Sequence, residues 1–275
     1  MRLTAHLVQK AKRARDVKDW LDEVNVMSRM GRSKRIVTFS DAGLYQGRCN
    51  GELTHKFSLE TEVYDGDLWG LGVETLPVAQ QIDVFRQAAL ALAEFHQYRY
   101  VHRDIKPGNF LYKRLGNGIK VSLTDFGLSE TYLRPENEMV HISGTRGYID
   151  PTISLDRVTD GVACRNADIC RRSDIFSLGM AFYTLLAGKK NIYKTKIASI
   201  NAKALPRKGD RQGTITETRS DMTDIVRYYS AQAVRKPHDR SVSVRLESLI
   251  WEMLNPKAAT RITLSEVDRR FAKLL

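Results

Sequence analysis

The chain has 275 residues, of which 42% are hydrophobic and 28% charged, and its net charge is +12. This length and composition fit one large domain or two lobes, and they exclude collagen, low-complexity disorder and a disulfide scaffold. No apolar run reaches the roughly 18 residues that a membrane span needs. The longest run, residues 175–188, stops at 14 residues and is predicted to be a core helix.

The cysteines and the N-terminus indicate a reducing, cytoplasmic compartment. Cys49, Cys164 and Cys170 are the three cysteines, and no two of them form a C-x-x-C pair. Such a set indicates reduced thiols rather than a zinc site or a disulfide framework. The N-terminus has basic residues but no apolar run of a secretory signal. We therefore expect a cytoplasmic protein, in the cell that makes it or in one into which it is delivered, and a basic targeting peptide is the less favoured alternative.

Positive charge is concentrated towards the C-terminus. Residues 189–275 hold 19 basic and 9 acidic side chains, whereas residues 1–188 hold 25 and 23. A region this basic either is an ordinary solvated face or attracts an acidic protein, an anionic membrane or nucleic acid. We expect an acidic protein partner, because the region has no nucleic-acid-binding motif.

The N-terminal quarter is predicted to combine one helix with short strands. Val17, Val24 and Met27 recur at helical spacing, which predicts a helix over residues 16–30. Residues 36–39 and 55–62 are predicted to be strands on either side of a glycine-containing loop at 43–51.

The remaining chain is predicted to be mainly helical. Pro77 opens a strong amphipathic helix, and two short strands at 109–112 and 119–124 follow it around an Asn117-Gly118 turn. A helix that is apolar on all sides is expected to begin at Asp174 and to lie centrally. Two closing helices are expected, at 243–254 and 263–275. The pattern indicates a small strand-containing part and a larger helical part, divided near residues 62–68.

Two neighbouring motifs carry the chemistry. Residues 101–109 read Val-His-Arg-Asp-Ile-Lys-Pro-Gly-Asn, and Thr-Asp-Phe-Gly follows at 124–127. A carboxylate such as Asp104 can accept the proton of an incoming hydroxyl, and Lys106 can offset charge on a phosphoryl group. Asp125 and Asn109 supply the oxygen ligands that Mg²⁺ prefers. An acidic surface turn would not need these groups together.

These residues resemble the eukaryotic-type protein kinase family, whose catalytic loop reads H-R-D-x-x-x-x-N and whose metal motif reads D-F-G. The resemblance implies an α+β, protein kinase-like two-lobe fold that binds ATP in its cleft. It divides the chain into a truncated small β-containing N-lobe at 1–62, a hinge and turn at 63–68, and a larger, mainly helical C-lobe at 69–275.

The resemblance also assigns roles. Asp104 becomes the catalytic base, Lys106 a phosphate contact, and Asn109 and Asp125 the Mg²⁺ ligands. Because a lysine at position 106 is typical of serine/threonine kinases, the expected reaction transfers the γ-phosphoryl group of ATP to a protein hydroxyl.

Upstream residues match the family's nucleotide contacts. Residues 7–10 resemble the V-A-I-K strand, so Lys10 is the expected contact to the α- and β-phosphates. Lys12 is the alternative, because side chains two apart on a strand point the same way. Glu23 is the expected ion-pair partner of that lysine, or else a solvated helix carboxylate.

Residues 59–68 resemble the hinge and the G-D-L turn that follows it. Thr61 is then the gatekeeper, and the backbone of Glu62 through Tyr64 is expected to contact adenine. Asp67, in the turn, completes the expected nucleotide-binding set.

Downstream, residues 144–151 resemble the family's substrate-docking segment, G-T-x-x-Y-x-x-P. Asp174 matches an aspartate that holds the catalytic loop's backbone, although it also suits an ordinary helix cap. Arg103 resembles the arginine that pairs with a phosphate on the activation segment. The expected acceptors are Ser129, Thr131, Tyr132 and Ser143, and a segment ordered without modification is the alternative.

The chain departs from the family pattern in three places. Only nine residues precede Lys10, too few for the glycine-rich loop that covers the phosphates. Thr152 stands where the family has a glutamate that pairs with a late arginine, here Arg261, so that ion pair is expected to be lost. Residues 153–172 form an unusually long linker. These departures motivate the alternative function, a pseudokinase or partner-dependent scaffold that binds nucleotide weakly.

Overall fold

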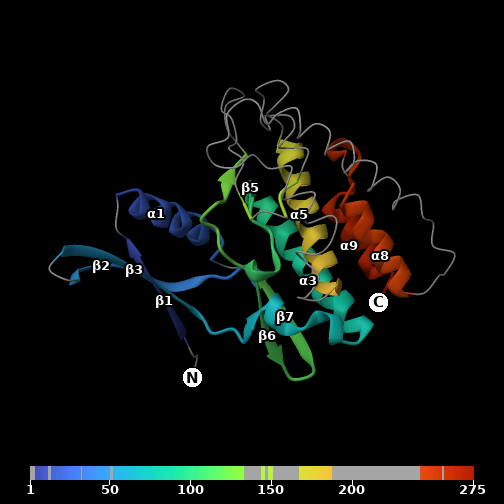
Figure 1. Cartoon of the computed structure of the whole chain (residues 1–275), viewed down its shortest axis with the longest axis horizontal. Coiled ribbons are helices and arrows are strands. Elements are labelled where there is room, and N and C mark those ends of the chain that lie inside the picture. Colours follow the sequence, from blue (N-terminus) through green and yellow to red (C-terminus); the bar gives the residue numbers. More distant parts are fainter. Residues whose placement is uncertain are drawn as a thin grey trace.

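The computed structural model describes residues 4–11, 14–31, 33–49, 52–132, 144–145, 148–150, 167–187, 242–255 and 257–275. Strands and one helix make up the N-terminal part, and helices dominate the C-terminal part (Figure 1). The expected features at Lys12, Ser143, Thr152 and residues 153–166 lie outside the described residues, as does most of the basic region.

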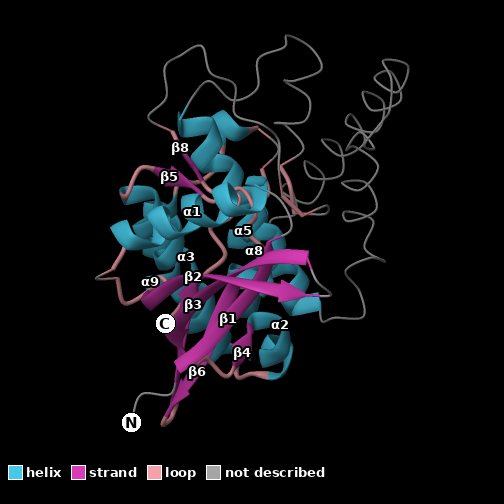
Figure 2. Ribbon diagram, turned by 90° about the vertical axis from the view of Figure 1, so that its left-hand side faces the viewer, coloured by secondary structure: helices cyan, strands magenta, loops and turns pink. Residues whose placement is uncertain are grey.

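The N-terminal part is a three-stranded antiparallel sheet with one helix. Its elements are β1 (Thr4–Ala11), α1 (Ala14–Arg29), β2 (Phe39–Cys49) and β3 (Glu52–Glu62). The strand order is β1-β3-β2, so β3 lies in the middle and β1 at an edge of the sheet (Figure 2). Of the face predicted from helical spacing, Met27 is buried and Val24 is partly buried. Val26 and Met30, the residue that follows the helix, are buried as well.

Two expectations for this part were wrong. The loop expected at 43–51 is instead largely strand, because β2 pairs with β3 from Phe39 to Cys49. In the register of this pair, Gly43 lies opposite Ser58 and Gly47 opposite Thr54. The strand expected at 36–39 is only an isolated bridge between Ile36 and Leu123. That bridge joins the N-terminal part to a strand far along the chain.

Short elements surround one long helix in the middle of the chain. They are β4 (Gly66–Asp67), α2 (Leu68–Leu71), η1 (Val73–Thr75), α3 (Val78–Gln97), β5 (Tyr100–Val101), η2 (Pro107–Asn109), β6 (Phe110–Leu115), β7 (Gly118–Leu123) and β8 (Glu130–Thr131). One small sheet has the order β4-β6-β7, and a second pairs β5 with β8. Pro77 stands just before α3, as expected.

Three helices complete the described C-terminal part, together with the short turn η4 (Ala258–Thr260). They are α5 (Ala167–Ala187), α8 (Val242–Met253) and α9 (Leu264–Ala272). As predicted, α5 is central, and Phe176, Leu178, Met180 and Phe182 on it are completely buried. The Phe182 ring stacks on Phe85 of α3 at a centroid distance of 4.2 Å.

One continuous core joins the two parts, from Met30 and Leu59 through α3 to Phe271 of α9. The fold is therefore α+β, with a small strand-rich N-terminal region and a helical C-terminal part. No described helix is long and apolar enough to cross a membrane. Cys170 is disulfide-bonded, contrary to the expectation of reduced thiols. The boundaries at 62 and 68 stay a prediction.

Candidate active site

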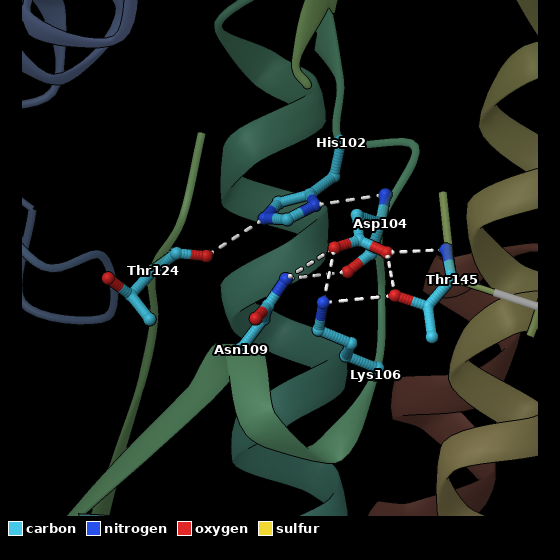
Figure 3. Close-up of polar contacts among 6 residues, drawn as sticks. All are labelled: His102, Asp104, Lys106, Asn109, Thr124 and Thr145. Atoms are coloured by element: carbon cyan, nitrogen blue, oxygen red, sulfur yellow. Dashed lines mark hydrogen bonds and ion pairs between the residues drawn. The ribbon is translucent and has the colours of Figure 1, made fainter. Parts of the chain in front are cut away.

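The carboxylate of Asp104 lies inside a ring of hydrogen-bond donors (Figure 3). Its Oδ2 accepts from Lys106 Nζ at 2.6 Å and from Asn109 Nδ2 at 3.2 Å. Its Oδ1 accepts from the backbone N–H of Thr145 at 2.8 Å and from the Thr145 hydroxyl at 2.7 Å. The residue is 7% exposed. These donors hold the nearly buried carboxylate in one orientation.

A buried aspartate of α5 holds the backbone of the catalytic loop through hydrogen bonds. Asp174 accepts hydrogen bonds from the backbone N–H groups of His102 at 2.7 Å and Arg103 at 2.9 Å. It also accepts from His96 Nε2 at 2.8 Å. Burial by itself would raise the pKa of Asp174, but the hydrogen bond from His96 and the neighbouring histidines hold that pKa below its ordinary value.

Asp174 is not a helix cap, which corrects one of the two sequence interpretations. The helix α5 begins at Ala167, so Asp174 lies two turns inside it. The apolar periodicity starts only at Ile175, which is why the sequence placed the start of the helix too late. The alternative interpretation, that Asp174 holds the catalytic loop, agrees with the observed hydrogen bonds.

His102 is a neutral, buried residue that links the catalytic loop to a neighbouring segment. Its Nδ1 accepts from the Asp104 backbone N–H at 3.3 Å, so Nε2 carries the proton and donates to the carbonyl of Thr124 at 3.0 Å. Burial lowers the pKa of His102, in keeping with this neutral form. The ring also packs against Phe126 at 5.6 Å. His102 thus ties the loop that carries Asp104 to the segment that carries Asp125.

The two expected Mg²⁺ ligands, Asn109 and Asp125, belong to segments that are neighbours through their backbone. The backbone N–H of Thr124 donates to the Asn109 carbonyl at 2.9 Å, which joins the two motifs. The Asn109 amide donates to Asp104, so its oxygen is left to face a ligand. Asp125 has φ of 65° and, within the described residues, no hydrogen-bond partner. A non-glycine residue in this strained conformation is typical of functional sites.

The described residues contain no group of three or more His, Cys, Asp or Glu side chains that could hold a metal ion. Mg²⁺ commonly uses one or two protein carboxylates and takes its other ligands from water and phosphate. Asn109 and Asp125 therefore fit this ion, although neither would hold it alone.

Glu23 of α1 lies beside Asp125. Burial and the negative charge of Asp125 raise the pKa of Glu23, and a hydrogen bond from the Phe126 backbone N–H lowers it. It is therefore not the solvated helix carboxylate of the alternative interpretation. Glu23 is the residue that the sequence expects to pair with a lysine of the nucleotide site.

The lysine itself is located only through its backbone. Lys10 lies in β1, where it pairs with Lys56 of β3, so the expected strand is present. The choice between Lys10 and Lys12 stays open, because the side chain of Lys10 and all of Lys12 lie outside the described residues.

The expected hinge has its side chains engaged elsewhere. Glu62 accepts from Lys113 Nζ at 2.8 Å and from Lys120 Nζ at 3.2 Å, and these lysines lower the pKa of Glu62. Lys120 Nζ also lies 5.8 Å from the centre of the Tyr64 ring. Asp67 caps α2 by accepting from Gly70 N–H at 2.8 Å. The backbone is thus what Glu62 and Tyr64 have to offer a ligand.

The ion pair expected to be lost at Thr152 has a substitute. Arg261 donates to Asp150 Oδ2 at 2.5 Å, and neither side chain is exposed to solvent. Asp150 stands two residues before Thr152 and supplies the missing carboxylate. The expectation was wrong because it assigned the partner of Arg261 by motif position, whereas any acid on the same buried turn can reach it.

Sequence reasoning did not single out three contributors to this site. His96 lies in the last turn of α3, and it donates to Asp174. Thr145 was one letter of a docking motif, and Glu130 carried no signal at all. Each acts through a partner distant in sequence, so only a pattern of paired residues could have revealed them.

Comparison with known proteins agrees with this geometry. The family described as "Protein kinase domain" matches residues 4–270. A probable serine/threonine-protein kinase PBL4 from Arabidopsis thaliana is 28% identical over 71% of this chain and 45% of its own length. CBL-interacting serine/threonine-protein kinase 7 from the same plant is 30% identical, over 70% and 36%.

A bacterial relative, the serine/threonine-protein kinase PknA of Corynebacterium glutamicum, is 35% identical over 42% of this chain and 22% of its own length. The chain spans less than half the length of each of these three relatives. Because the family matches nearly the whole chain, the protein belongs to the protein kinase family.

Proposed function

We propose that the protein is an ATP- and Mg²⁺-dependent kinase that transfers the γ-phosphoryl group to a serine or threonine of a protein substrate. The observation that carries this proposal is the ring of donors around Asp104, from Lys106, Asn109 and Thr145. Phosphoryl transfer needs little covalent chemistry from the protein, so positioning and charge account for most of catalysis.

Asp104 accepts and holds the proton of the substrate hydroxyl. A carboxylate has about four lone-pair sites, and the four hydrogen bonds that the Asp104 carboxylate accepts use them all. A substrate hydroxyl must therefore take the place of one donor. The Thr145 hydroxyl is the one hydroxyl among these four donors, so a substrate hydroxyl replaces it like for like. Lys106 is then in position to neutralise charge on the phosphoryl group.

The nucleotide side of the site uses the remaining predicted residues. Asn109 and Asp125 hold Mg²⁺, which supplies positive charge beside the phosphate oxygens. Lys10 contacts the α- and β-phosphates and pairs with Glu23. The backbone between Glu62 and Tyr64 orients the adenine.

The decisive experiment incubates the purified protein with labelled ATP, Mg²⁺ and a protein substrate. We expect Asp104→Asn to lower turnover by about 10²- to 10⁴-fold, the usual contribution of a positioned base. The matched control is Asp268→Asn, which loses only the half-exposed pair with Arg86 and should keep wild-type turnover. Wild-type turnover in Asp104→Asn would refute the proposal. Lys10→Met should also cripple the enzyme and Lys12→Met should not; the reverse result moves the phosphate contact to Lys12.

The substrate is expected to be acidic rather than basic around its acceptor. In kinases that prefer arginine before the acceptor, an acid often precedes the catalytic-loop asparagine, and here that position is Gly108. The basic excess in residues 189–275 also favours an acidic partner, within the Debye length of about 8 Å. A peptide array dominated by arginine just before serine would refute this preference.

The alternative function is a pseudokinase or partner-dependent scaffold with weak nucleotide binding. The observation that favours it is that β1, which carries Lys10, lies at the edge of the described three-stranded sheet. Within the described residues, no further strand lies beside β1 to cover a nucleotide phosphate. Titration calorimetry with ATP and Mg²⁺ separates the two functions. A kinase should bind the nucleotide and lose that binding in Asp125→Asn, whereas a scaffold should show no binding that depends on Asp125.

A further inference from the structure

The side chain of Arg103 ties the catalytic loop to the segment that follows Asp125. Its Nη1 forms an ion pair with the Glu130 carboxylate, and its Nε donates to the Leu128 carbonyl at 2.6 Å. The backbone of the same arginine, at φ of 68°, donates to Asp174. One residue therefore joins α5, the catalytic loop and β8.

The segment around Glu130 is docked along its described length. Glu130 and Thr131 form β8, and Glu130 pairs with Val101 of β5. The Thr131 hydroxyl donates to the Arg99 carbonyl at 3.2 Å. The Tyr132 hydroxyl donates to the His96 carbonyl at 2.9 Å. Both hydroxyls, which the sequence suggested as phosphate acceptors, are thus used as hydrogen-bond donors inside the fold.

Burial makes the Arg103–Glu130 pair mutually dependent. The Glu130 side chain is 7% exposed and that of Arg103 is 19% exposed. A carboxylate with so little access to water needs a cation, and leaving one partner of such a pair alone is costly. A phosphate on this segment would bring a charge of about −1.5 to −2 to the same guanidinium. Glu130 brings a carboxylate to this guanidinium without any modification of the chain.

We propose that Glu130 is a positioning residue that takes the place of an activating phosphate. By pairing with Arg103 it orders residues 128–132 and holds the catalytic loop, so that the unmodified chain is already competent. This inference rests on the proposed kinase function. Of the two alternatives that the sequence left open, it selects a segment ordered without modification.

The test uses the full-length protein after phosphatase treatment, with intact mass spectrometry to show that no phosphate remains. Glu130→Gln removes the charge and keeps the shape, whereas Glu130→Asp keeps the charge. The matched control is Glu94→Gln, which loses an ion pair with Arg35 that is 47% exposed on the arginine side. Phosphoryl transfer to dephosphorylated casein and hydrogen exchange of the 128–132 amides are measured for each protein.

We expect the dephosphorylated wild type to keep its turnover within twofold. Glu130→Gln should lower kcat at least tenfold with the KM for ATP within twofold, and its 128–132 amides should exchange at least tenfold faster. Glu130→Asp should retain at least a third of wild-type kcat, and Glu94→Gln should match the wild type. A side chain with a merely structural role would lower thermal stability without this selective loss of kcat.

Three results would overturn the inference. One is wild-type kcat and exchange in Glu130→Gln. Another is a loss of more than tenfold in wild-type turnover after phosphatase treatment. The third is a Glu130→Asp variant as inactive as Glu130→Gln. If Glu130→Gln does not fold, the other two measurements decide. A loss of turnover after phosphatase treatment, or a Glu130→Asp kcat under a third of the wild-type value, then overturns the inference. If the wild type transfers no phosphate at all, the proposed function fails, and the exchange of the 128–132 amides still decides whether Glu130 orders the segment.

Discussion

The buried pair between Asp150 and Arg261 predicts a large and selective loss of stability. Both side chains have no exposure to solvent, and the Arg261 guanidinium also lies over the Phe176 ring at 5.1 Å. Asp150→Asn keeps the volume but leaves the guanidinium buried with no charge partner on that side. Removing one partner of a buried pair costs about 3–5 kcal/mol, a large share of the roughly 5–15 kcal/mol that holds a protein folded.

Denaturant and thermal unfolding of three variants measure this cost. Asp150→Asn should lose about 3–5 kcal/mol of unfolding free energy, which corresponds to a fall in Tm of roughly 6–20 °C at about 2–4 °C per kcal/mol. The double variant Asp150→Asn/Arg261→Met should lose less than Asp150→Asn, because it leaves no buried charge without a partner. Glu252→Gln is the control: its pair with Arg270 is 42% and 34% exposed and should contribute about 1 kcal/mol at most.

The reasoning fails if Asp150→Asn stays within about 1 kcal/mol of the wild type, the range of an exposed pair. It also fails if the double variant loses as much as the sum of the two single variants, since residues in contact should not be additive. Thr152→Glu placed on Asp150→Asn adds a further comparison. Recovery of stability there would mean that either position can supply the carboxylate to Arg261.

Three other predictions follow from close approaches and buried groups. Gly179→Ala should destabilise the protein by about 1–3 kcal/mol in chemical unfolding, the usual cost of overpacking, because a Cβ there would lie 2.9 Å from Met253 Cβ between α5 and α8; an unchanged midpoint would contradict this packing. Gly144→Ala should lower turnover at least tenfold with little change in Tm, because Gly144 has φ of 129° and a Cβ would collide with the Arg103 carbonyl; wild-type kcat would count against it. The pKa of His102 is lowered from its ordinary value of 6.5 in the native protein. Below pH 6.5 the unfolded chain therefore takes up a proton that the native protein excludes. The free energy of unfolding should decrease as the pH is lowered, by at most about 1.4 kcal/mol per pH unit. His102→Gln should lack that slope in unfolding between about pH 6.5 and 5, and an identical pH profile would show that the group is not held neutral.

The sequence by itself determined the family and the four residues that we propose as catalytic or metal-binding. Asp104, Lys106, Asn109 and Asp125 lie within one stretch of 22 residues, separated by one hairpin, so their spacing already brings them together. The central position of α5 was also predictable, since a helix that is apolar on all sides has no face left for water. Local chemistry and periodicity are sufficient for both conclusions.

Only the tertiary structure decided which distant residues support that set. His96 of α3 contacts the Asp174 carboxylate that holds the catalytic loop, and Glu130 of β8 pairs with Arg103 of that loop. No spacing along the chain announces those two contacts. Asp150 supplies the carboxylate that the family has two residues later, because the buried Arg261 needs a nearby acid whatever its position in the motif. Likewise, β2 stays a strand across Gly43 and Gly47 because it pairs with β3 along this length. That pairing cannot be seen in the sequence of β2 alone.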